Sequence, residues 1–397
     1  MLFAMAWQPD CDVAVIGAGI QGVGVAQAMA AAGYRVQVLE KDHPAAGTSS
    51  KSSKLIHGGL RYLETFQWRL VRSSLHEREI LLRIAPDLVH MVPFHIPVYR
   101  GMRRGPWTIR AGLSLYALLG NLRPEARFSK LSKDAWAGLD GLKTEGLRAV
   151  YRYFDGQTDD AMLCRAVLAS ACELGAEVAL GAEVISAEAD SHGWTLRYRK
   201  NQEVLELHAR TVVNAGGPFV AQIADHLSPK PPHRAIDLVG GTHIELPGKL
   251  EAGIYYTEAP SDGRAVFTIP WKGHTMVGTT EHPARSPENP VPTEQEIEYL
   301  LGVYRHHFPA GSTELVDAWA GLRVLPRADG SLFRRSREVT LVGNHPRRPS
   351  LVSIYGGKLT GYRSTAAKVE ETIVPSLGPA PRRADTATLR LPKLPLA

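Results

Sequence analysis

The amino-acid sequence predicts an α/β protein, α+β overall, in which a Rossmann-like dinucleotide-binding domain is interrupted by an antiparallel β-sheet domain. Three observations lead to this fold class. The stretch 12–40 has the strand–turn–helix–strand pattern of a βαβ unit around a G-x-G-x-x-G turn. Two further Gly-Gly turns, at 216–217 and 356–357, each follow a short apolar run. The stretch 225–315 between them is a series of short strand patterns.

The βαβ unit begins with an apolar run at 13–16, suited to a buried parallel strand, and continues into a small-residue helix. Gly17 permits a tight turn, Gly19 lets the backbone approach a pyrophosphate, and Gly22 lets helix and strand pack closely. Glu40 ends the second strand, where its carboxylate can accept hydrogen bonds from ribose hydroxyls. The simpler alternative is a glycine-rich turn in an ordinary α/β protein. The acid at the strand end favours the nucleotide interpretation.

Composition sets broad limits on the class of protein. A chain of 397 residues suits two or three domains, and its net charge of +6 fits an anionic substrate or an anionic lipid surface without requiring either. The three cysteines form neither metal spacing nor a disulfide framework, so we expect a reducing compartment and no metal site. We expect no signal peptide, no membrane-spanning segment and no nucleic-acid partner.

The stretch 41–64 follows the βαβ unit and is rich in Gly, Ser and Lys. Its hydroxyl groups can cap a helix or bind phosphates, and its paired glycines permit close approach to a flat ligand. For composition alone a solvated surface loop is the better interpretation, but this loop directly follows a nucleotide-binding unit. The residues expected at a cofactor here are Thr48, Ser49, Ser50, Ser53, Lys54, Leu55, His57, Gly58 and Gly59.

The stretch 83–149 differs in character from the nucleotide-binding unit. Residues 90–100 alternate like a sheet strand, and an apolar helix pattern follows with Arg103, Arg104 and Arg110 beside it. Basic flanks with Trp and Tyr suit a helix lying on anionic lipid. A core helix with basic ends is an equally good interpretation.

The remaining chain completes the predicted domain plan. We assign 1–82, 150–224 and 316–378 to a discontinuous cofactor domain, and 83–149 and 225–315 to a substrate domain. Helices are predicted at 23–32, 68–82, 160–174 and 294–306, and another begins at Lys358. The helix at 160–174 is expected to be capped by Asp159 or Thr158. The Pro- and Arg-rich stretch 379–397 is predicted to be an irregular tail.

The three glycine-rich turns lie in the first, middle and last parts of the chain. A nicotinamide dehydrogenase usually concentrates its cofactor motifs in one domain, whereas FAD is long and draws on distant segments. This distribution indicates FAD. The other expected cofactor contacts are Gly17, Gly19, Ile20, Gln21, Gly22, Glu40, Val184, Ala215, Gly216, Gly217, Gly356, Gly357, Lys358, Leu359 and Thr360.

Several segments carry a resemblance to a known family: SSKSSKLIHGGLRYLE at 49–64, VVNAGGPFV at 212–220, and the short motifs GGTHI, WAGLRVL and GGKLT. They resemble the FAD-dependent glycerol-3-phosphate dehydrogenases, which belong with the D-amino acid oxidase-like flavoproteins. Two positions depart from the family pattern: Gly216 stands where Thr is usual, and Glu281 where Asp is usual. Bacterial members typically carry a further helical C-terminal domain, which we do not expect in this sequence.

The resemblance implies oxidation of sn-glycerol 3-phosphate to dihydroxyacetone phosphate, with electrons passed through FAD to a membrane quinone. It implies that the site residues are Arg61, Tyr62, His243, Arg323 and Lys358. In that assignment Arg323 binds the phosphate, and Arg61 is a second phosphate-binding cation or a flavin-side cation. Lys358 stabilises the reduced flavin or the substrate oxygen, and His243 is the candidate base. His57 competes with His243 for the last role. Taken singly, each of these residues is more often a surface charge or a structural histidine.

Two other functions remain open at this stage. An oxidase of the same fold would act on an amine or 2-hydroxy acid with oxygen as acceptor, without two phosphate-binding cations. A non-catalytic flavoprotein would bind FAD as a sensor or assembly factor. The resemblance further implies a cytoplasmic protein that contacts the inner face of the cytoplasmic membrane. It leaves the oligomeric state undetermined.

Overall fold

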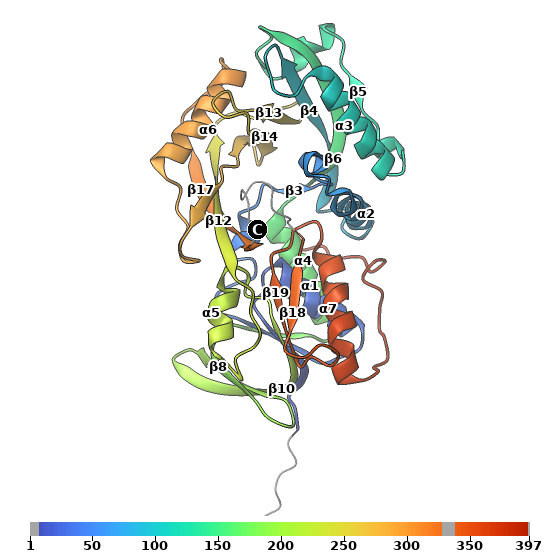
Figure 1. The fold of residues 1–397 in the computed structure, drawn as a ribbon, viewed down its shortest axis with the longest axis vertical. Helices are drawn as coiled ribbons and strands as arrows, with labels where there is room; N and C mark the ends of the chain where they lie inside the picture. The colour runs from blue at the N-terminus through green and yellow to red at the C-terminus, as the bar shows by residue number, and fades with distance from the viewer. Residues whose placement is uncertain (1–7, 328–337, 396–397) are drawn as a thin grey trace, which may run out of the picture.

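The computed structural model describes residues 8–327 and 338–395. The chain forms an elongated molecule of two lobes, each built around one large β-sheet (Figure 1). The lower lobe in that view holds both the N-terminal strand and the C-terminal helix α7, and the upper lobe is formed by intervening segments. The predicted fold class is confirmed: a parallel nucleotide-binding sheet is combined with a mostly antiparallel second sheet.

The cofactor lobe contains a nine-stranded sheet. Its parallel centre has the order β19–β10–β1–β2–β7. The strands are β1 (Cys11–Ile16), β2 (Val36–Glu40), β7 (Glu177–Leu180), β8 (Glu183–Ala189), β9 (Trp194–Lys200), β10 (Glu203–Asn214), β11 (Leu227–Ser228), β18 (Thr340–Gly343) and β19 (Leu351–Tyr355). Because β1 pairs with both β2 and β10, the first glycine-rich turn lies at the centre of the sheet's carboxyl edge.

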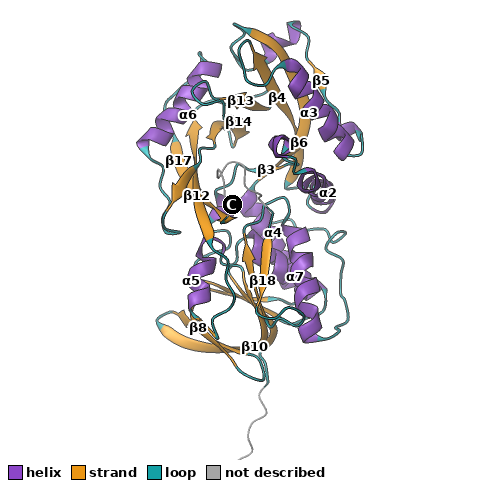
Figure 2. Cartoon of the chain, in the orientation of Figure 1, coloured by secondary structure: helices purple, strands orange, loops and turns teal. Residues whose placement is uncertain are grey.

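Three helices cover one face of this sheet: α1 (Ile20–Ala31), α4 (Asp160–Glu173) and α7 (Tyr362–Leu377) (Figure 2). Almost every residue of α1 is buried, which explains why its sequence is mostly Ala, Gly and Val, without a polar stripe. Asp159 caps α4 by accepting a hydrogen bond from the Met162 amide at 3.0 Å, as the Thr/Asp pattern predicts. The short helix α5 (Val220–Asp225) follows β10.

The second lobe contains a ten-stranded sheet in the order β16–β12–β15–β14–β13–β4–β6–β3, with β17 on β12 and β5 on β6. Its strands are β3 (Leu55–Ile56), β4 (Val89–Tyr99), β5 (Ser129–Lys130), β6 (Leu147–Thr158), β12 (Ile236–Leu246), β13 (Ile254–Glu258), β14 (Ala265–Trp271), β15 (His274–Gly278), β16 (His282–Ala284) and β17 (Asp317–Pro326). The pair β13–β4 is parallel, and the other pairings are antiparallel.

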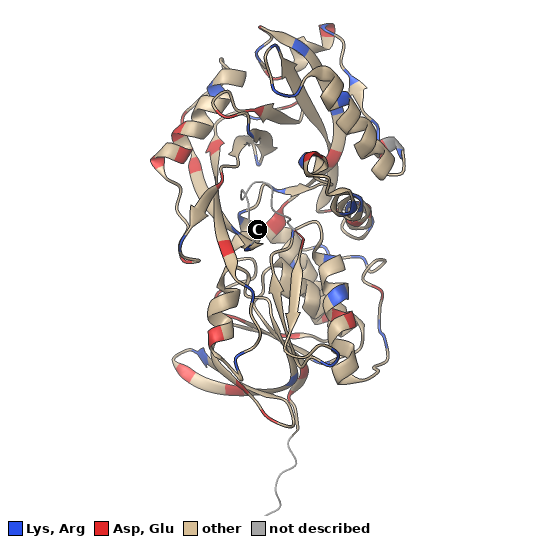
Figure 3. Cartoon of the chain, in the orientation of Figure 1, with Lys and Arg blue, Asp and Glu red and all other residues tan. Residues whose placement is uncertain are grey.

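Three helices pack on this second sheet: α2 (Trp68–Ile84), α3 (Pro106–Leu119) and α6 (Glu294–His307). Thr293 and Glu296 form a capping box that starts α6 at its predicted first residue. Helix α3 buries Ile109, Leu113 and Tyr116 against the sheet and exposes Trp107 to 79%. Arginines lie on α2 and α3 and acidic residues lie on α6 (Figure 3), although α2 also contains Glu77 and Glu79 and α6 contains Arg305. Among the described residues, no helix has the length and apolar character needed to cross a bilayer.

Three details differ from the sequence-based assignment. Strands β3, β6 and β17 belong to the second sheet, although most of their residues were assigned to the cofactor domain. Helix α7 begins at Tyr362, so residues 358–361 form a turn rather than the predicted helix start. Arg104, expected beside a lipid-facing helix, is 9% exposed and pairs with Glu64 and Glu258.

The tail after α7 has no helix or strand through residue 395, as predicted, but it is not detached from the body. The Arg383 amide donates to the Ala31 carbonyl at 2.7 Å, and the Leu391 amide donates to the Ile84 carbonyl at 2.7 Å. Leu391 is 6% exposed in the core that also contains α1 and α4. The tail therefore packs across the ends of α1 and α2.

Candidate cofactor and substrate site

A cavity of about 690 Å³ lies between the two sheets and is lined by both. Its wall combines the turn at 17–21, the loop 46–62, the turn at 215–219 and the turn at 356–360, with residues of β12 and β17 at one end. These segments are remote in the sequence. The predicted glycine-rich turns at 17–22, 216–217 and 356–357 thus meet at one site.

At one end of the cavity the turn after β1 exposes backbone rather than side chains. Gly17 has φ +103°, and a Cβ on Gly22 would lie 1.9 Å from the Gly17 carbonyl oxygen. Glu40 accepts hydrogen bonds from the Ala18 amide at 2.6 Å and from the Asp42 amide at 2.9 Å. These contacts hold the Glu40 carboxylate at the end of β2, where it lines the cavity.

Hydrogen bonds between the wall segments keep the cavity in shape. Ser49 Oγ accepts from the Ile20 amide at 2.9 Å, and Thr48 donates to the Leu322 carbonyl at 2.6 Å. The His57 amide donates to Thr360 Oγ1 at 3.3 Å. Gln21 Nε2 donates to the Lys358 carbonyl at 3.3 Å, and its buried Oε1 has no partner among the described residues. The loop 48–59 is therefore tied both to the first turn and to the last.

Four of the predicted cofactor residues do not line the cavity. Gly22 packs α1 against β1, and Ser50 Oγ donates to the Gly47 carbonyl. The Lys54 ammonium is buried in an ion pair with Asp160, at 2.7 Å, because a lone buried cation would be costly. The Gly58 amide donates to Tyr116 at 2.9 Å beneath the wall. Their effect on a cofactor is through the shape of the wall.

At the other end of the cavity two of the predicted cations converge on one acid. Arg323 Nη1 lies 2.8 Å from Glu281 Oε1, and Arg61 Nη2 lies 3.6 Å from the same oxygen. Arg264 Nη2 lies 3.0 Å from the other oxygen, Oε2. The Glu281 side chain is only 8% exposed. Arg323 Nη2 also donates to Thr279 Oγ1 at 3.2 Å, so its guanidinium plane is held at two points.

His243 is buried and His57 is half-buried, and the pKa of each lies well below its ordinary value. Burial, aided by the charges of Arg323 and Lys54, lowers the pKa of His243 to about 3. Its Nε2 lies 2.9 Å from Ser53 Oγ, and its ring stacks on Trp319 with centroids 5.7 Å apart. Burial also lowers the pKa of His57 to about 4, opposed by the nearby Asp155.

Lys358 lies on the cavity wall in the turn before α7. Its ammonium stands 3.8 Å from the centroid of the Tyr62 ring, which is within the range of a cation–π contact. Lys358, Tyr62, Arg61, His243 and Arg323 all line the same cavity, although they come from four separate segments. The structure therefore brings together the whole predicted substrate set.

Sequence reasoning missed part of this end of the site. Arg264 and Thr279 were not predicted, and Glu281 was noted without a role. Tyr256 and Phe267 add aromatic wall. The available signal was weak: Thr279 and Glu281 are polar residues just after a strand, and Arg264 directly precedes one. No local pattern indicates that Arg264 shares the Glu281 carboxylate with Arg61 and Arg323.

The cavity fits an extended dinucleotide. The wall has glycines where a Cβ would enter occupied space, backbone amides at the start of α1, and a carboxylate at the end of β2. Gly217 and Gly47 leave open space on the cavity side, since no heavy atom lies within 4 Å of the point that a Cβ would occupy on either residue. Fold and site together define a flavin-dependent oxidoreductase. The family model for FAD dependent oxidoreductases matches residues 12–363.

Relatives narrow this class. A glycerol-3-phosphate dehydrogenase of Pseudomonas tolaasii is 38% identical over 92% of this chain and 71% of its own length. A D-erythritol 1-phosphate dehydrogenase of Brucella abortus is 34% identical over 92% and 74%. The solved structure of a Bacillus halodurans glycerol-3-phosphate dehydrogenase complexed with FAD superposes with a TM-score of 0.72 at 26% identity, covering 96% of this chain and 67% of that one. The chain belongs to the FAD-dependent glycerol-3-phosphate dehydrogenase family, and its cofactor is FAD.

Proposed function

We propose that this protein oxidises sn-glycerol 3-phosphate to dihydroxyacetone phosphate. The observation that carries the proposal is that Arg61, Arg323, Lys358 and His243 line one cavity, where Arg61 and Arg323 meet on the same carboxylate. A phosphate monoester needs paired guanidinium donors, and an alcohol that loses hydride needs a proton acceptor at its hydroxyl group. FAD, when bound, accepts the hydride from the alcohol carbon. An amine or 2-hydroxy acid would not need two arginines at this end.

Each residue has a role that follows from its position. Arg323, whose guanidinium is fixed by Glu281 and Thr279, presents its positive charge to the phosphate, and Arg61 approaches from the loop side. Lys358 places a positive charge at the wall that the flavin ring would face, where negative charge develops during reduction. Val184, at the opposite end, belongs to the wall for the adenosine part.

His243 is the candidate proton acceptor. Because burial keeps its imidazole neutral, a ring nitrogen is available to accept a proton. Ser53 orients the ring through Nε2 and Trp319 through stacking. The charge of Arg323 contributes to the low pKa of His243, so a bound phosphate that offsets this charge would make the imidazole more basic. His57 lies under the cofactor wall, and its competing role is positioning that wall.

The electron acceptor in this proposal is a membrane quinone, and the supporting feature is a surface formed by α2, α3 and the turns beside them. Its exposed apolar side chains are Phe66 at 79%, Trp68 at 48%, Trp107 at 79%, Leu118 at 59% and Leu122 at 58%. Exposed aromatic groups beside arginines suit the interface of an anionic bilayer. The protein would then lie on the inner face of the cytoplasmic membrane.

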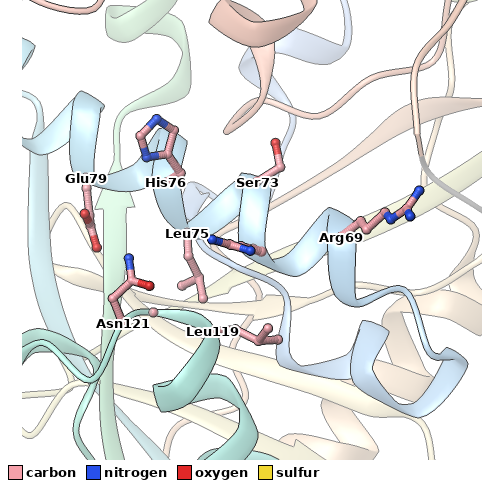
Figure 4. Close-up of a pocket in the computed structure, with 9 residues that line it drawn as sticks. Arg69, Ser73, Leu75, His76, Glu79, Leu119 and Asn121 are labelled. Atoms are coloured by element: carbon pink, nitrogen blue, oxygen red, sulfur yellow. The ribbon is translucent and has the colours of Figure 1, made fainter.

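A hollow of about 390 Å³ between α2 and the end of α3 adds to this surface (Figure 4). Arg69 and Arg72 line it and form no ion pair with any residue in 8–327 or 338–395. Both belong to α2, whose start carries the exposed Trp68. Two unneutralised guanidinium groups beside exposed aromatics are complementary to lipid phosphates.

The activity is tested by anaerobic titration of the FAD-loaded protein while the flavin absorbance is followed. We expect sn-glycerol 3-phosphate to bleach the flavin and a quinone analogue to restore it. Equal titrations with D-erythritol 1-phosphate, glycerol and a 2-hydroxy acid separate the alternatives, since one relative carries the erythritol name. Absence of bleaching by sn-glycerol 3-phosphate would contradict the proposal. Reoxidation by oxygen as fast as by the quinone analogue would indicate the oxidase.

The lipid contact is tested by sedimentation with liposomes that contain anionic phospholipid. We expect the double variant Arg69→Glu, Arg72→Glu to bind at least tenfold more weakly, and Trp107→Ala to bind more weakly at any lipid charge. The matched control is Arg347→Glu, Arg348→Glu, a double charge reversal at exposed positions between β18 and β19. Equal loss of binding in both double variants would show that only net charge matters.

A further inference from the structure

The acid at the substrate end of the cavity faces an unusual set of partners. Glu281 is the carboxylate around which Arg61, Arg264 and Arg323 gather, and these arginines come from the η2 turn (Leu60–Thr65), the residue before β14, and β17. A carboxylate at the phosphate end of a substrate site is at first sight unfavourable, because it repels an anionic ligand. Its presence there calls for a physical role.

The two oxygens of Glu281 have different partners. Oε2 is held by Arg264, which is not part of the cavity wall, at 3.0 Å. Oε1 faces Arg323 and Arg61, which are part of the wall, at 2.8 and 3.6 Å. The carboxylate is thus anchored from outside and offsets part of the charge of the two cations that line the cavity. A ligand phosphate in the cavity can approach these two guanidinium groups, while Arg264 keeps Glu281 in place.

Charge balance then gives the acid a function. The negative charge of Glu281 offsets part of the positive charge that Arg61, Arg264 and Arg323 place at this end of the cavity. A phosphate monoester carries a charge of about −1.5 to −2 at neutral pH, so it is attracted more strongly than a single carboxylate. Without Glu281 the same three guanidinium groups would bind any small anion more tightly.

We propose that Glu281 is an internal counter-ion of the phosphate site: it holds the arginines together without substrate and limits the affinity for anions when substrate binds. Arg264 is the positioning residue that anchors it. This inference rests on the proposed function, because it assigns the phosphate end of the substrate to the arginine cluster. It adds a specificity-determining acid and a third arginine to the predicted set.

The test is isothermal titration of the FAD-loaded protein with inorganic phosphate. For Glu281→Gln, which keeps the size and loses the charge, we expect the dissociation constant to fall at least tenfold. For acetate the fall should be about threefold, because Coulomb energy scales with ligand charge. Glu281→Asp keeps the charge and should stay within about threefold of the wild type.

A second variant distinguishes the proposed effect of charge from a loss of folded structure. Arg264→Met removes the anchor and one positive charge, so phosphate should bind at least tenfold more weakly. The two substitutions thus have opposite signs, whereas structural damage weakens binding in both. The control Glu258→Gln removes an acid from the arginine pair with Arg104, away from the cavity, and should leave the phosphate affinity unchanged.

FAD content and the thermal unfolding midpoint are measured for every variant. Unchanged or weaker phosphate binding in Glu281→Gln, with FAD retained, would overturn the inference. If Glu281→Gln does not retain FAD, a phosphate affinity of Arg264→Met equal to that of the wild type overturns it instead. Failure of the proposed function is a separate result, since it appears as a wild-type flavin that sn-glycerol 3-phosphate does not reduce.

Discussion

The two lobes recognise their ligands by different means. In the cofactor lobe the ligand-facing wall is largely backbone: glycine turns after β1 and β10, the start of α1, and a single acid at the end of β2. In the second lobe the wall is made of side chains, with Arg61 and Arg323 on Glu281 and His243 between Ser53 and Trp319. The cofactor wall depends on positions where the chain carries no side chain. The substrate wall depends on particular charged and polar side chains.

The interiors of the two lobes also differ in their content of charged and titratable side chains. The core around α1, α4 and α7 consists mostly of small and aliphatic residues, although the start of α4 buries Asp160 in its ion pair with Lys54. The second sheet buries His95, His243 and His307, together with the ion pair Arg78–Asp155, whose side chains are each 1% exposed. A sheet that holds charged and titratable groups in its interior can present them to a ligand, but it becomes sensitive to pH. We therefore expect cofactor binding to be lost when a substitution adds atoms at a glycine. We expect substrate binding to be lost when a substitution changes the charge or the hydrogen-bond donors of a side chain.

The largest effect is expected from a side chain added beneath the backbone wall of the cofactor site. Gly22→Val places a Cβ into the Gly17 carbonyl oxygen, so FAD content after purification should fall at least tenfold. Gly302→Ala is the matched control, because no heavy atom lies within 4 Å of its added Cβ and Gly302 lies in α6, outside the cavity lining. The expected difference between the lobes would be contradicted if Gly22→Val retained FAD while Ser49→Ala, which deletes a side-chain hydroxyl group, lost it.

A smaller effect is expected from a side-chain change in the second lobe. Arg323→Lys keeps the charge but loses the planar pair of donors, so KM for sn-glycerol 3-phosphate should rise about tenfold to a hundredfold. FAD content should stay at the wild-type level. The control is Arg327→Lys, since Arg327 is exposed and pairs with Asp237 outside the cavity. A comparable loss of FAD in Arg323→Lys would show that the two functions are not separable.

The smallest effect is expected in the response to acid. Burial lowers the pKa of His95 and of His307 to about 4 each, whereas an unfolded histidine titrates near pH 6.5. Between these values the unfolded chain binds more protons, so stability falls as the pH drops from about 6.5 to about 4, by roughly 1.4 kcal/mol per pH unit for each group. Urea unfolding of His95→Phe at pH 7 and pH 5 should show a smaller difference than the wild type, by about 1–2 kcal/mol. An unchanged difference would contradict burial of a neutral His95.

Several elements could be predicted closely from the sequence. The helices α1, α2, α4 and α6 begin or end near their predicted residues, because glycine turns, an Asp cap and a Thr–Glu capping box are local signals. Strand partners are not local signals. Strand β17 pairs with β12, which lies some eighty residues earlier in the chain. Nothing within 317–326 indicates that this strand belongs to the second sheet rather than to the cofactor domain.

The same limit applies to the candidate site. The motif around Lys54 resembles a flavin-contacting loop, but its ammonium pairs with Asp160, which lies 106 positions later. The grouping of Arg61, Arg264 and Arg323 on one carboxylate joins residues from opposite ends of the chain. A single charged residue in a sequence carries no information about the charge that will face it.

The sequence by itself determined the cofactor and the class of fold, because a backbone that must turn tightly and approach a pyrophosphate requires glycine at fixed spacing, and spacing is visible in a chain. Only the tertiary structure decided which cations share an acid, which histidines become neutral and which loop residues turn away from the cavity. Those outcomes depend on burial and on Coulomb interactions over a few ångströms between residues that are remote in sequence. In this protein they converge on Glu281 and its three arginines.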